Sequence, residues 1–209
     1  MLIPLNILNN KFNLNIKGVL HIGAHECEEQ PQYLRQGVSN DNIYWVEAMP
    51  NKVKEMKNKN NKLNILQAVI NDIDNMDVTF NITNNGQSSS FLEFGTHSIH
   101  HPHVLVTKKI KLKTTRLDTL INNNNIPIQQ LNFMNLDIQG VELNALKSMG
   151  EYIKHIDYIY TEVNTEKVYK NCALISEIDD FLKTLGFERV SQKIYKQYGW
   201  GDAFYIRKY

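Results

Sequence analysis

Polar side chains follow two apolar segments in the second half of the chain. Asp137 and Gln139 come directly after one segment, and Glu162 and Asn164 lie at the end of the next. Because a carboxylate can accept the proton of an alcohol, Asp137 is a candidate general base. Asp137, Glu162 and Asn164 also offer three oxygen ligands of the kind that Mg²⁺ prefers. The alternative is that Glu162, Asn164 and Gln139 hydrogen-bond a substrate or a loop backbone without a metal.

Four histidines between residues 97 and 103 form a second group of candidates. The segment reads HSIHHPH and lies in a long polar stretch. We take His97 and His101 as candidate general bases, because imidazole is the side chain most often used in that role. A zinc site is one alternative, although no cysteine accompanies these histidines. A solvated cluster without a ligand is the other.

Two further segments have side chains suited to bonding or stacking on a sugar. They supply the candidate substrate contacts Gln87, Ser88, Ser89, Ser90 and Trp200. Each also has a structural interpretation, because serine and glutamine are ordinary loop residues and a tryptophan can cover the core as a lid.

A single glycine follows the first apolar run, in the sequence Gly23-Ala24-His25. A dinucleotide fold requires G-x-G-x-x-G at this point, so that the backbone can approach a pyrophosphate. One glycine therefore argues against NAD and FAD, whereas S-adenosylmethionine has no pyrophosphate. Glu47 lies 24 residues after Gly23, near the spacing of ~20 at which an acid reaches ribose hydroxyls. Cys27 is assigned no role, because neighbouring glutamates oppose its ionisation.

Strands and helices must alternate to position these residues. Apolar runs at 18–23, 42–48 and 63–70 indicate buried strands, with helices between them. In the helix at 25–37 we expect Tyr33 and Leu34 to face inward. Its first turn is expected to hold three acids, favoured there by the helix dipole, namely Glu26, Glu28 and Glu29.

The segment 76–114 interrupts this alternation. MDVTFNI and KKIKLKTT alternate apolar and polar residues, which predicts antiparallel strands, and the polar loop between them is long enough to be functional. The alternation then resumes, and FERVSQKIY and DAFYIRKY predict a closing antiparallel pair. We expect one doubly wound sheet with an antiparallel edge. Ligands bind such a sheet outside the carboxyl ends of its strands, where the candidate residues gather.

The composition limits the classes of function. The 209 residues suit a single domain, with 1–17 as an N-terminal extension and 76–114 as a substrate-side insertion. Lys and Arg number 23 against 22 Asp and Glu, so no nucleic-acid partner is expected. Two cysteines make no disulfide framework, and no apolar window approaches the ~18 residues of a membrane span. We expect a cytoplasmic protein, in the host cytoplasm if the chain is viral, and leave a homo-oligomer open.

Seven segments together resemble the FkbM family of S-adenosylmethionine-dependent methyltransferases. They are VLHIGAHECEEQPQYL, IYWVEAMP, NNGQSSSFLEFGTH, TTRLDTL, LDIQGVELNALKSM, YTEVNTEKVY and WGDAFYIR, over roughly residues 18–205. DIQGVELNAL is similar to the family's D-x-E-G-x-E-x-x-x-L block, and GAH precedes WVEAMP as in the family. The resemblance implies an α/β Rossmann-like class I methyltransferase sheet of seven strands, mostly parallel with an antiparallel C-terminal strand. It also implies methyl transfer to oxygen, often on sugars or polyketide hydroxyls.

Carried over by position, the resemblance implies a cofactor site for S-adenosylmethionine. Its loop is Gly23, Ala24 and His25, and its other members are Glu47 at the ribose, Ala48, and Ala68 and Val69 beside the adenine. Three positions depart from the family pattern. His21 stands where Asp is usual, His25-Glu26-Cys27 replaces Asn-x-Gly, and Gln139 stands where Glu is usual. The family's carboxylates therefore cannot all be assumed to act here.

The function expected from the sequence is an S-adenosylmethionine-dependent O-methyltransferase that acts on a sugar or glycan precursor. Mg²⁺ is an optional second cofactor. Two alternatives stay open, a non-catalytic binding or scaffold protein of the same fold and an NAD-dependent nucleotide-sugar enzyme. Binding of S-adenosylmethionine and turnover distinguish the three.

Overall fold

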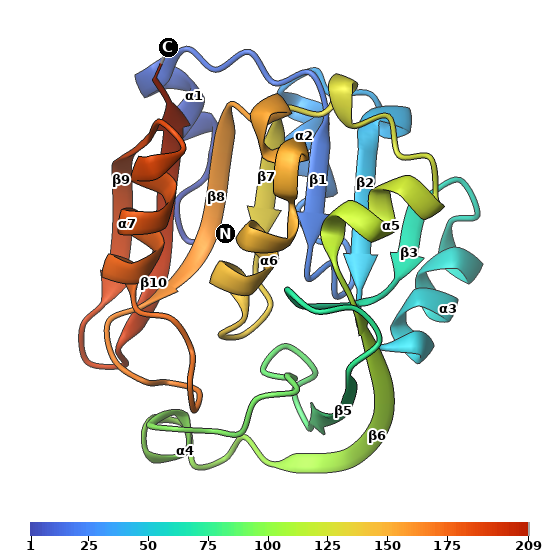
Figure 1. Cartoon of the computed structure of the whole chain (residues 1–209), viewed down its shortest axis with the longest axis vertical. Coiled ribbons are helices and arrows are strands. Elements are labelled where there is room, and N and C mark those ends of the chain that lie inside the picture. Colours follow the sequence, from blue (N-terminus) through green and yellow to red (C-terminus); the bar gives the residue numbers. More distant parts are fainter. Residues whose placement is uncertain (209) are drawn as a thin grey trace.

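A computed structural model describes residues 1–208, and its centre is a seven-stranded sheet (Figure 1). The strands are β1 (Val19–Ile22), β2 (Ile43–Glu47), β3 (Asn64–Gln67), β7 (Phe133–Leu136), β8 (Tyr158–Asn164), β9 (Phe187–Tyr195) and β10 (Trp200–Arg207). Their order in the sheet is β3-β2-β1-β7-β8-β10-β9. The first five pair in parallel, and β10 is antiparallel to both of its neighbours. The predicted fold class is confirmed.

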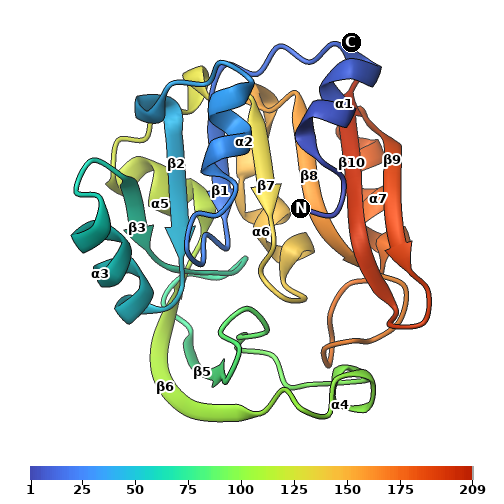
Figure 2. The same ribbon diagram turned by 180° about the vertical axis from the view of Figure 1, so that it is seen from behind.

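Helices cover both faces of this sheet. One face carries α5 (Leu117–Asn123), α6 (Glu142–Ser148) and α7 (Ile175–Thr184) (Figure 1). The other carries α1 (Leu5–Phe12), α2 (Gln30–Arg35) and α3 (Pro50–Lys59) (Figure 2). Short 3₁₀ turns connect some of these elements, namely η1 (Asn40–Asn42), η2 (Ile128–Gln130) and η3 (Gly150–His155).

Each face has its own apolar core. Leu120, Leu146 and Ile178 belong to the core under α5, α6 and α7, and Tyr33 and Trp45 belong to the core under α1, α2 and α3. Two buried layers make the central strands apolar on both sides, as the continuous apolar runs predicted. None of the helices that the structure describes combines the length and the apolar character needed to cross a membrane.

A second sheet lies across the end toward which the parallel strands of the first sheet point (Figure 1). It consists of β4 (Val69–Ile70), β6 (Val106–Thr115) and β5 (Asp77–Thr83), with α4 (His97–His100) between β5 and β6. The antiparallel pairing of β5 with β6 confirms the hairpin predicted for 76–114. Val78 and Phe80 pack inward against Met49 and Val69, while lysines of β6 are exposed. We call residues 76–114 the flap.

Two details of the prediction are wrong. The expected strand at 63–70 splits at Ala68, whose N–H bonds the carbonyl of Glu47, so β3 stays in the main sheet and β4 joins β6. The helix expected at 25–37 is α2, which starts only at Gln30, and its first turn holds none of the expected acids.

The late start of α2 follows from the backbone before it. His25 and Cys27 have φ angles of 43° and 58°, which a right-handed helix excludes. Glu26 and Glu28 therefore lie in turns before the helix, and Glu29 is its N-cap. The helix has six residues and one buried face, so Tyr33 is buried while Leu34 is 42% exposed, contrary to expectation.

Candidate functional site

A cavity of about 500 Å³ lies between the carboxyl ends of the main strands and the flap. This volume is within the range of small-molecule sites. The order of strands reverses between β1 and β7, and ligands of open α/β sheets bind at such a switch point. Most of the residues predicted from the sequence line the cavity, namely Gly23, His25, Glu47, Ala48, Ala68, Val69, Gln87, Ser88, Ser89, Ser90, His97, His101, Asp137, Gln139, Glu162 and Trp200. Ala24 and Asn164 are not among its lining residues.

Gly23 forms the floor of the cavity at the end of β1. Its φ is +93°, and a Cβ there would lie 1.8 Å from the carbonyl oxygen of Asp137. Only glycine allows the tips of β1 and β7 to come this close. The glycine found in the sequence therefore brings the expected cofactor loop next to the candidate base.

Glu47 holds the loop against the tip of β2. Its Oε2 accepts a hydrogen bond from the backbone N–H of His25 at 2.8 Å, and its Oε1 accepts one from Met49 N–H at 2.8 Å. Burial raises the pKa of Glu47, and the hydrogen bonds from Met49 and His25 oppose that shift. Each carboxylate oxygen has a second lone pair, so both can still accept ribose hydroxyls.

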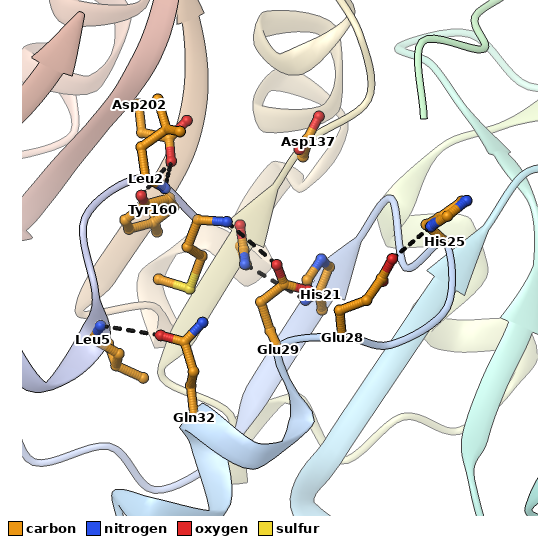
Figure 3. A network of polar contacts seen from close by, with 12 residues as sticks. Leu2, Leu5, His21, His25, Glu28, Glu29, Gln32, Asp137, Tyr160 and Asp202 are labelled. Atoms are coloured by element: carbon orange, nitrogen blue, oxygen red, sulfur yellow. Dashed lines mark hydrogen bonds and ion pairs between the residues drawn. The ribbon is translucent and has the colours of Figure 1, made fainter. Parts of the chain in front are cut away.

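His25 links the cofactor loop to the flap. Its Nδ1 lies 2.6 Å from Glu28 Oε1, a contact that raises the pKa of the imidazole (Figure 3). On the flap side its Nε2 faces Gly86, where a Cβ would come within 3.1 Å. Gly86 also has a φ of +74°, so the turn of the flap needs glycine for two reasons.

A second wall of the cavity consists of acidic groups at the tips of adjacent strands. Asp137 follows β7 and is exposed to the cavity, whereas Glu162 in β8 is only 7% exposed. Burial by the surrounding protein, followed by Asp202, raises the pKa of Asp137. Burial, followed by Asp137 and then Glu142, raises the pKa of Glu162 further. Two acids with different environments are the arrangement in which one stays protonated while the other ionises.

The N-terminal segment closes one side of the cavity. Leu2 N–H donates to Asp202 Oδ2 at 2.5 Å, and Ile3 N–H donates to the Tyr160 hydroxyl at 2.9 Å. Figure 3 shows the contact of Leu2 with Asp202 near Asp137, together with the bond from Leu5 N–H to Gln32. Met1, Leu2, Tyr160 and Asp202 all line the cavity, and the sequence interpretation missed each of them. The two contacts join residues 200 and 157 positions apart, which no local pattern reveals.

His97 is the most deeply buried of the four flap histidines, at 5% exposed. Its ring stacks on Phe94 at 4.3 Å and lies near Tyr169, and its Nδ1 has no hydrogen-bond partner. Burial, followed by His101 and then the other flap histidines, lowers the pKa of His97 to about 4. His97 is therefore neutral at physiological pH, with one nitrogen unpaired in a cavity wall.

The other flap histidines have different surroundings. His101 and His103 line the cavity, and burial lowers the pKa of His101 as well. His100 lies outside the lining and pairs its Nε2 with Glu166 Oε1 at 2.7 Å. Of the four, only His97 is a buried cavity-lining residue with a buried ring nitrogen that has no hydrogen-bond partner.

The three predicted serines are bonded within the protein. Ser88 Oγ accepts from the Asn85 amide, Ser89 Oγ accepts from Thr83 N–H, and Ser90 Oγ donates to the carbonyl of Gln139. These hydroxyls stabilise the flap internally and connect it to the loop that follows β7. Trp200 borders the cavity with its ring edge-on to Tyr195, at 5.4 Å.

The predicted metal ligands are only partly brought together. Asp137 and Glu162 face the cavity, whereas the Asn164 amide is fully buried with both polar atoms unpartnered. Within residues 1–208 no three His, Cys, Asp or Glu side chains are grouped so as to hold a metal ion. Magnesium at these residues stays a prediction.

His21 occupies the position where an acid was expected from the family pattern. Its ring is buried under the loop, with Nδ1 2.9 Å from the Tyr33 hydroxyl, which also accepts from the Asn135 amide at 2.8 Å. Burial lowers the pKa of His21 to about 4, so the imidazole is neutral. The side chain at position 21, beside the loop at Gly23, is therefore neutral in this chain.

Comparison with known proteins supports the fold independently. A family model described as the methyltransferase FkbM domain matches residues 21–189. Among solved structures, the chain is similar to magnesium protoporphyrin IX methyltransferase from Synechocystis PCC 6803 with bound SAM, at 10% identity and a TM-score of 0.50, over 97% of this chain and 76% of that one. It is also similar to a protein of the NADB-Rossmann superfamily from Streptococcus agalactiae, at 9% identity and a TM-score of 0.50, over 99% of this chain and 68% of that one. No curated protein matches the chain.

Proposed function

The chain belongs to the FkbM methyltransferase domain family, and from that membership we propose that it transfers a methyl group from S-adenosylmethionine to a hydroxyl of a sugar or glycan precursor. The observation that carries the proposal is the position of Asp137. Its carboxyl group faces the cavity at the switch point, and its backbone borders the cofactor loop at Gly23. A base is therefore available beside the expected methyl donor.

The lining residues fit S-adenosylmethionine. Glu47 has free lone pairs for the ribose hydroxyls, and the loop at Gly23 leaves room for the methionine part. Ala68 and Val69, with Phe80 of the flap, supply apolar surface for the adenine.

The cofactor supplies a methyl group that its sulfonium makes ready for displacement. The acceptor oxygen forms the new O–C bond as the S–C bond breaks, and the hydroxyl proton passes to Asp137. Holding the partners in line lowers the barrier by on the order of 7–11 kcal/mol. A base contributes ~10²–10⁴-fold more. The flap and the N-terminal segment help to exclude water from the cavity.

The charges of the cavity support an acceptor without phosphate. Six carboxyl groups line it, and no lysine or arginine is among its described lining residues. An anionic acceptor such as a nucleotide sugar or a nucleic acid would face these carboxyl groups without a lysine or arginine side chain to pair with. The rings of His97, Tyr169 and Trp200 provide faces on which a neutral sugar can stack. The two cysteines are free and buried, in keeping with an intracellular protein.

Two measurements test this proposal. Isothermal calorimetry should detect S-adenosylmethionine binding in the wild type, strongly weakened in Glu47→Ala and unchanged in Glu55→Ala, which alters an exposed pair with Lys59. Incubation with methyl-labelled cofactor and free sugars, glycosides and nucleotide sugars, analysed by mass, should give labelled product with the uncharged acceptors. Absence of cofactor binding contradicts the proposal. Binding without turnover on any acceptor favours a scaffold protein.

A further inference from the structure

Strand β6 has one edge without a neighbouring strand. Along residues 106–113 it pairs with β5 on one side, whereas β4 joins the other side only at Thr114 and Thr115. No other backbone–backbone hydrogen bond reaches residues 106–113 in the part of the chain that the structure describes. In Figure 1 β6 lies at the outer margin of the flap, with β5 on its inner side. An open edge of this length, about 26 Å at ~3.3 Å per residue, is a surface with which an extended chain can pair.

The backbone of three lysines points to this open side. Thr114 N–H donates to the carbonyl of Met76 at 3.0 Å, on the side of β5. The carbonyl of Thr115 accepts from Asn71 N–H at 3.1 Å, on the side of β4. Successive residues of a paired strand direct their N–H and C=O groups to opposite sides. Counted back from Thr114, the residues whose backbone groups are directed to the open side are Lys109, Lys111 and Lys113.

The side chains of these lysines lie on the outer face of the β5–β6 hairpin. Ile110 and Leu112 alternate with them and pack inward against the apolar cluster of the flap. All three lysines are exposed, and none of them lines the cavity. A chain paired with β6 would therefore cover the outside of the flap and not enter the cavity.

The positive charge of this edge is only partly neutralised within the chain. Lys113 has an ion pair with Asp77 at 3.0 Å, whereas Lys109 and Lys111 have no ion pair with an acid among residues 1–208. The charge of Lys109 acts on Glu93, but that acid already pairs with another lysine at 2.7 Å. The flap as a whole has four lysines and two acids. An excess of positive charge therefore remains along the open edge.

The other long open edge, β9 at the end of the main sheet, differs in this respect. Its Glu188 pairs with Lys208 at 3.1 Å, and its Arg189 pairs with Asp179 at 2.9 Å. A negatively charged segment is therefore attracted more strongly to β6 than to β9. Two copies of β6 paired with each other would set lysine against lysine, which is unfavourable. The edge of β6 thus favours a partner of opposite charge over a second copy of this chain.

We propose that the open edge of β6 binds an acidic segment of a partner protein, which adds to the flap as a further strand with its acidic side chains beside Lys109, Lys111 and Lys113. The main-chain hydrogen bonds of an added strand supply affinity, and its side chains supply specificity. Because side chains alternate between the two faces of a strand, the fitting segment alternates acidic residues with apolar ones beside Ile110 and Leu112. The inference is independent of the proposed methyl transfer, since none of the three lysines belongs to the cavity.

The test measures binding of a synthetic octapeptide of alternating glutamate and valine by fluorescence anisotropy. We expect saturable binding that weakens as salt is added. A peptide with the same residues in two blocks should bind more weakly, because it cannot place its acids on one face. Lys109→Gln combined with Lys111→Gln should lower the affinity by about threefold to tenfold. The matched control, Lys54→Gln combined with Lys57→Gln at two exposed lysines of α3, should leave the affinity unchanged.

Amide hydrogen exchange of the unmodified protein, resolved by NMR, distinguishes strand addition from a loose association of charges. Saturating peptide should slow exchange at Lys109, Lys111 and Lys113 by about tenfold or more. The amides of Ile110 and Leu112, which already face β5, should change little. This measurement needs no variant, so it decides the question even if the lysine substitutions disturb folding.

Four outcomes overturn the inference. They are the absence of peptide binding at low salt, equal binding of the blocked peptide, binding without the alternating protection in β6, and an affinity that the substitutions in β6 leave in place. Vesicles containing phosphatidylserine and a single-stranded oligonucleotide are measured in parallel. Binding of either of them without binding of the peptide would assign the lysines to a different class of partner and would also overturn it.

Discussion

Replacing Asp137 by Asn separates proton acceptance from every other role of this side chain. The amide oxygen of Asn can still accept the hydrogen bond from Gln139 Nε2, which now joins the two groups at 2.6 Å. The backbone contact with Gly23 is unaffected, because it involves the carbonyl of residue 137. The variant therefore keeps the shape of the site and loses only the ability to take a proton.

The expected loss in kcat is about 10²–10⁴-fold, the usual contribution of a general base. This corresponds to about 3–5 kcal/mol of transition-state stabilisation, at 1.36 kcal/mol for each factor of ten. The affinity for S-adenosylmethionine should stay the same, since the introduced amide lines the cavity as the carboxyl group did. In the wild type, kcat should fall as the pH drops through the raised pKa of Asp137, because protonation removes the base.

The assay is single-turnover methyl transfer from labelled cofactor to the best acceptor of the panel, with affinity measured separately by calorimetry. A variant as active as the wild type would refute the assignment of the base. His97 would then be the next candidate, and His97→Gln should carry the loss. A loss of cofactor affinity as large as the loss of kcat would also refute the reasoning, because it would indicate a damaged site.

Three other changes have clear expectations. Glu162→Gln should raise the melting temperature at neutral pH and have little effect below the unfolded pKa. The folded pKa of Glu162 is raised, so its ionisation costs stability only as pH rises above that unfolded value, and thermal unfolding across pH checks this. Gly86→Ala should weaken cofactor binding in calorimetry, because the added Cβ meets His25 at a position with positive φ. His97→Phe should keep or raise the melting temperature, since it removes an unpaired buried nitrogen, while raising the KM for the acceptor.

The order of strands and helices could be predicted because local sequence patterns indicate it. Apolar runs mark β1, β2, β7 and β8, and period-two alternation marks the β5–β6 hairpin. The division of the third strand could not be predicted from such a pattern. Residues 63–70 read as one largely apolar run, and the break at Ala68 depends on a backbone bond to Glu47 and on pairing of β4 with β6. Both are contacts with distant parts of the chain.

In the candidate site, too, local patterns predicted some residues, whereas others depend on contacts between distant parts of the chain. Glu47 ends β2, and Gly23 and Asp137 directly follow β1 and β7, so the rule that ligands bind at the carboxyl ends of strands found them. Asp202 and Tyr160 line the cavity and bond the N-terminal segment, and that segment carries no motif that would have pointed to them. The hydrogen bonds from Gln139 to Asp137 and Glu162 could likewise not be predicted, because the sequence shows only that a glutamine stands where glutamate is usual.

The departures at His21 and Gln139 have one physical effect in common. At each position the family pattern has a carboxylate and this chain has a neutral group, an imidazole with a pKa of about 4 in one case and an amide in the other. Both lie among acids that the chain retains, since Glu29 and Glu28 act on His21 while Asp137 and Glu162 flank Gln139. Six carboxyl groups already line the cavity. Two more would raise the cost of ionising any of them, so the two neutral residues help to keep a carboxylate available as a base.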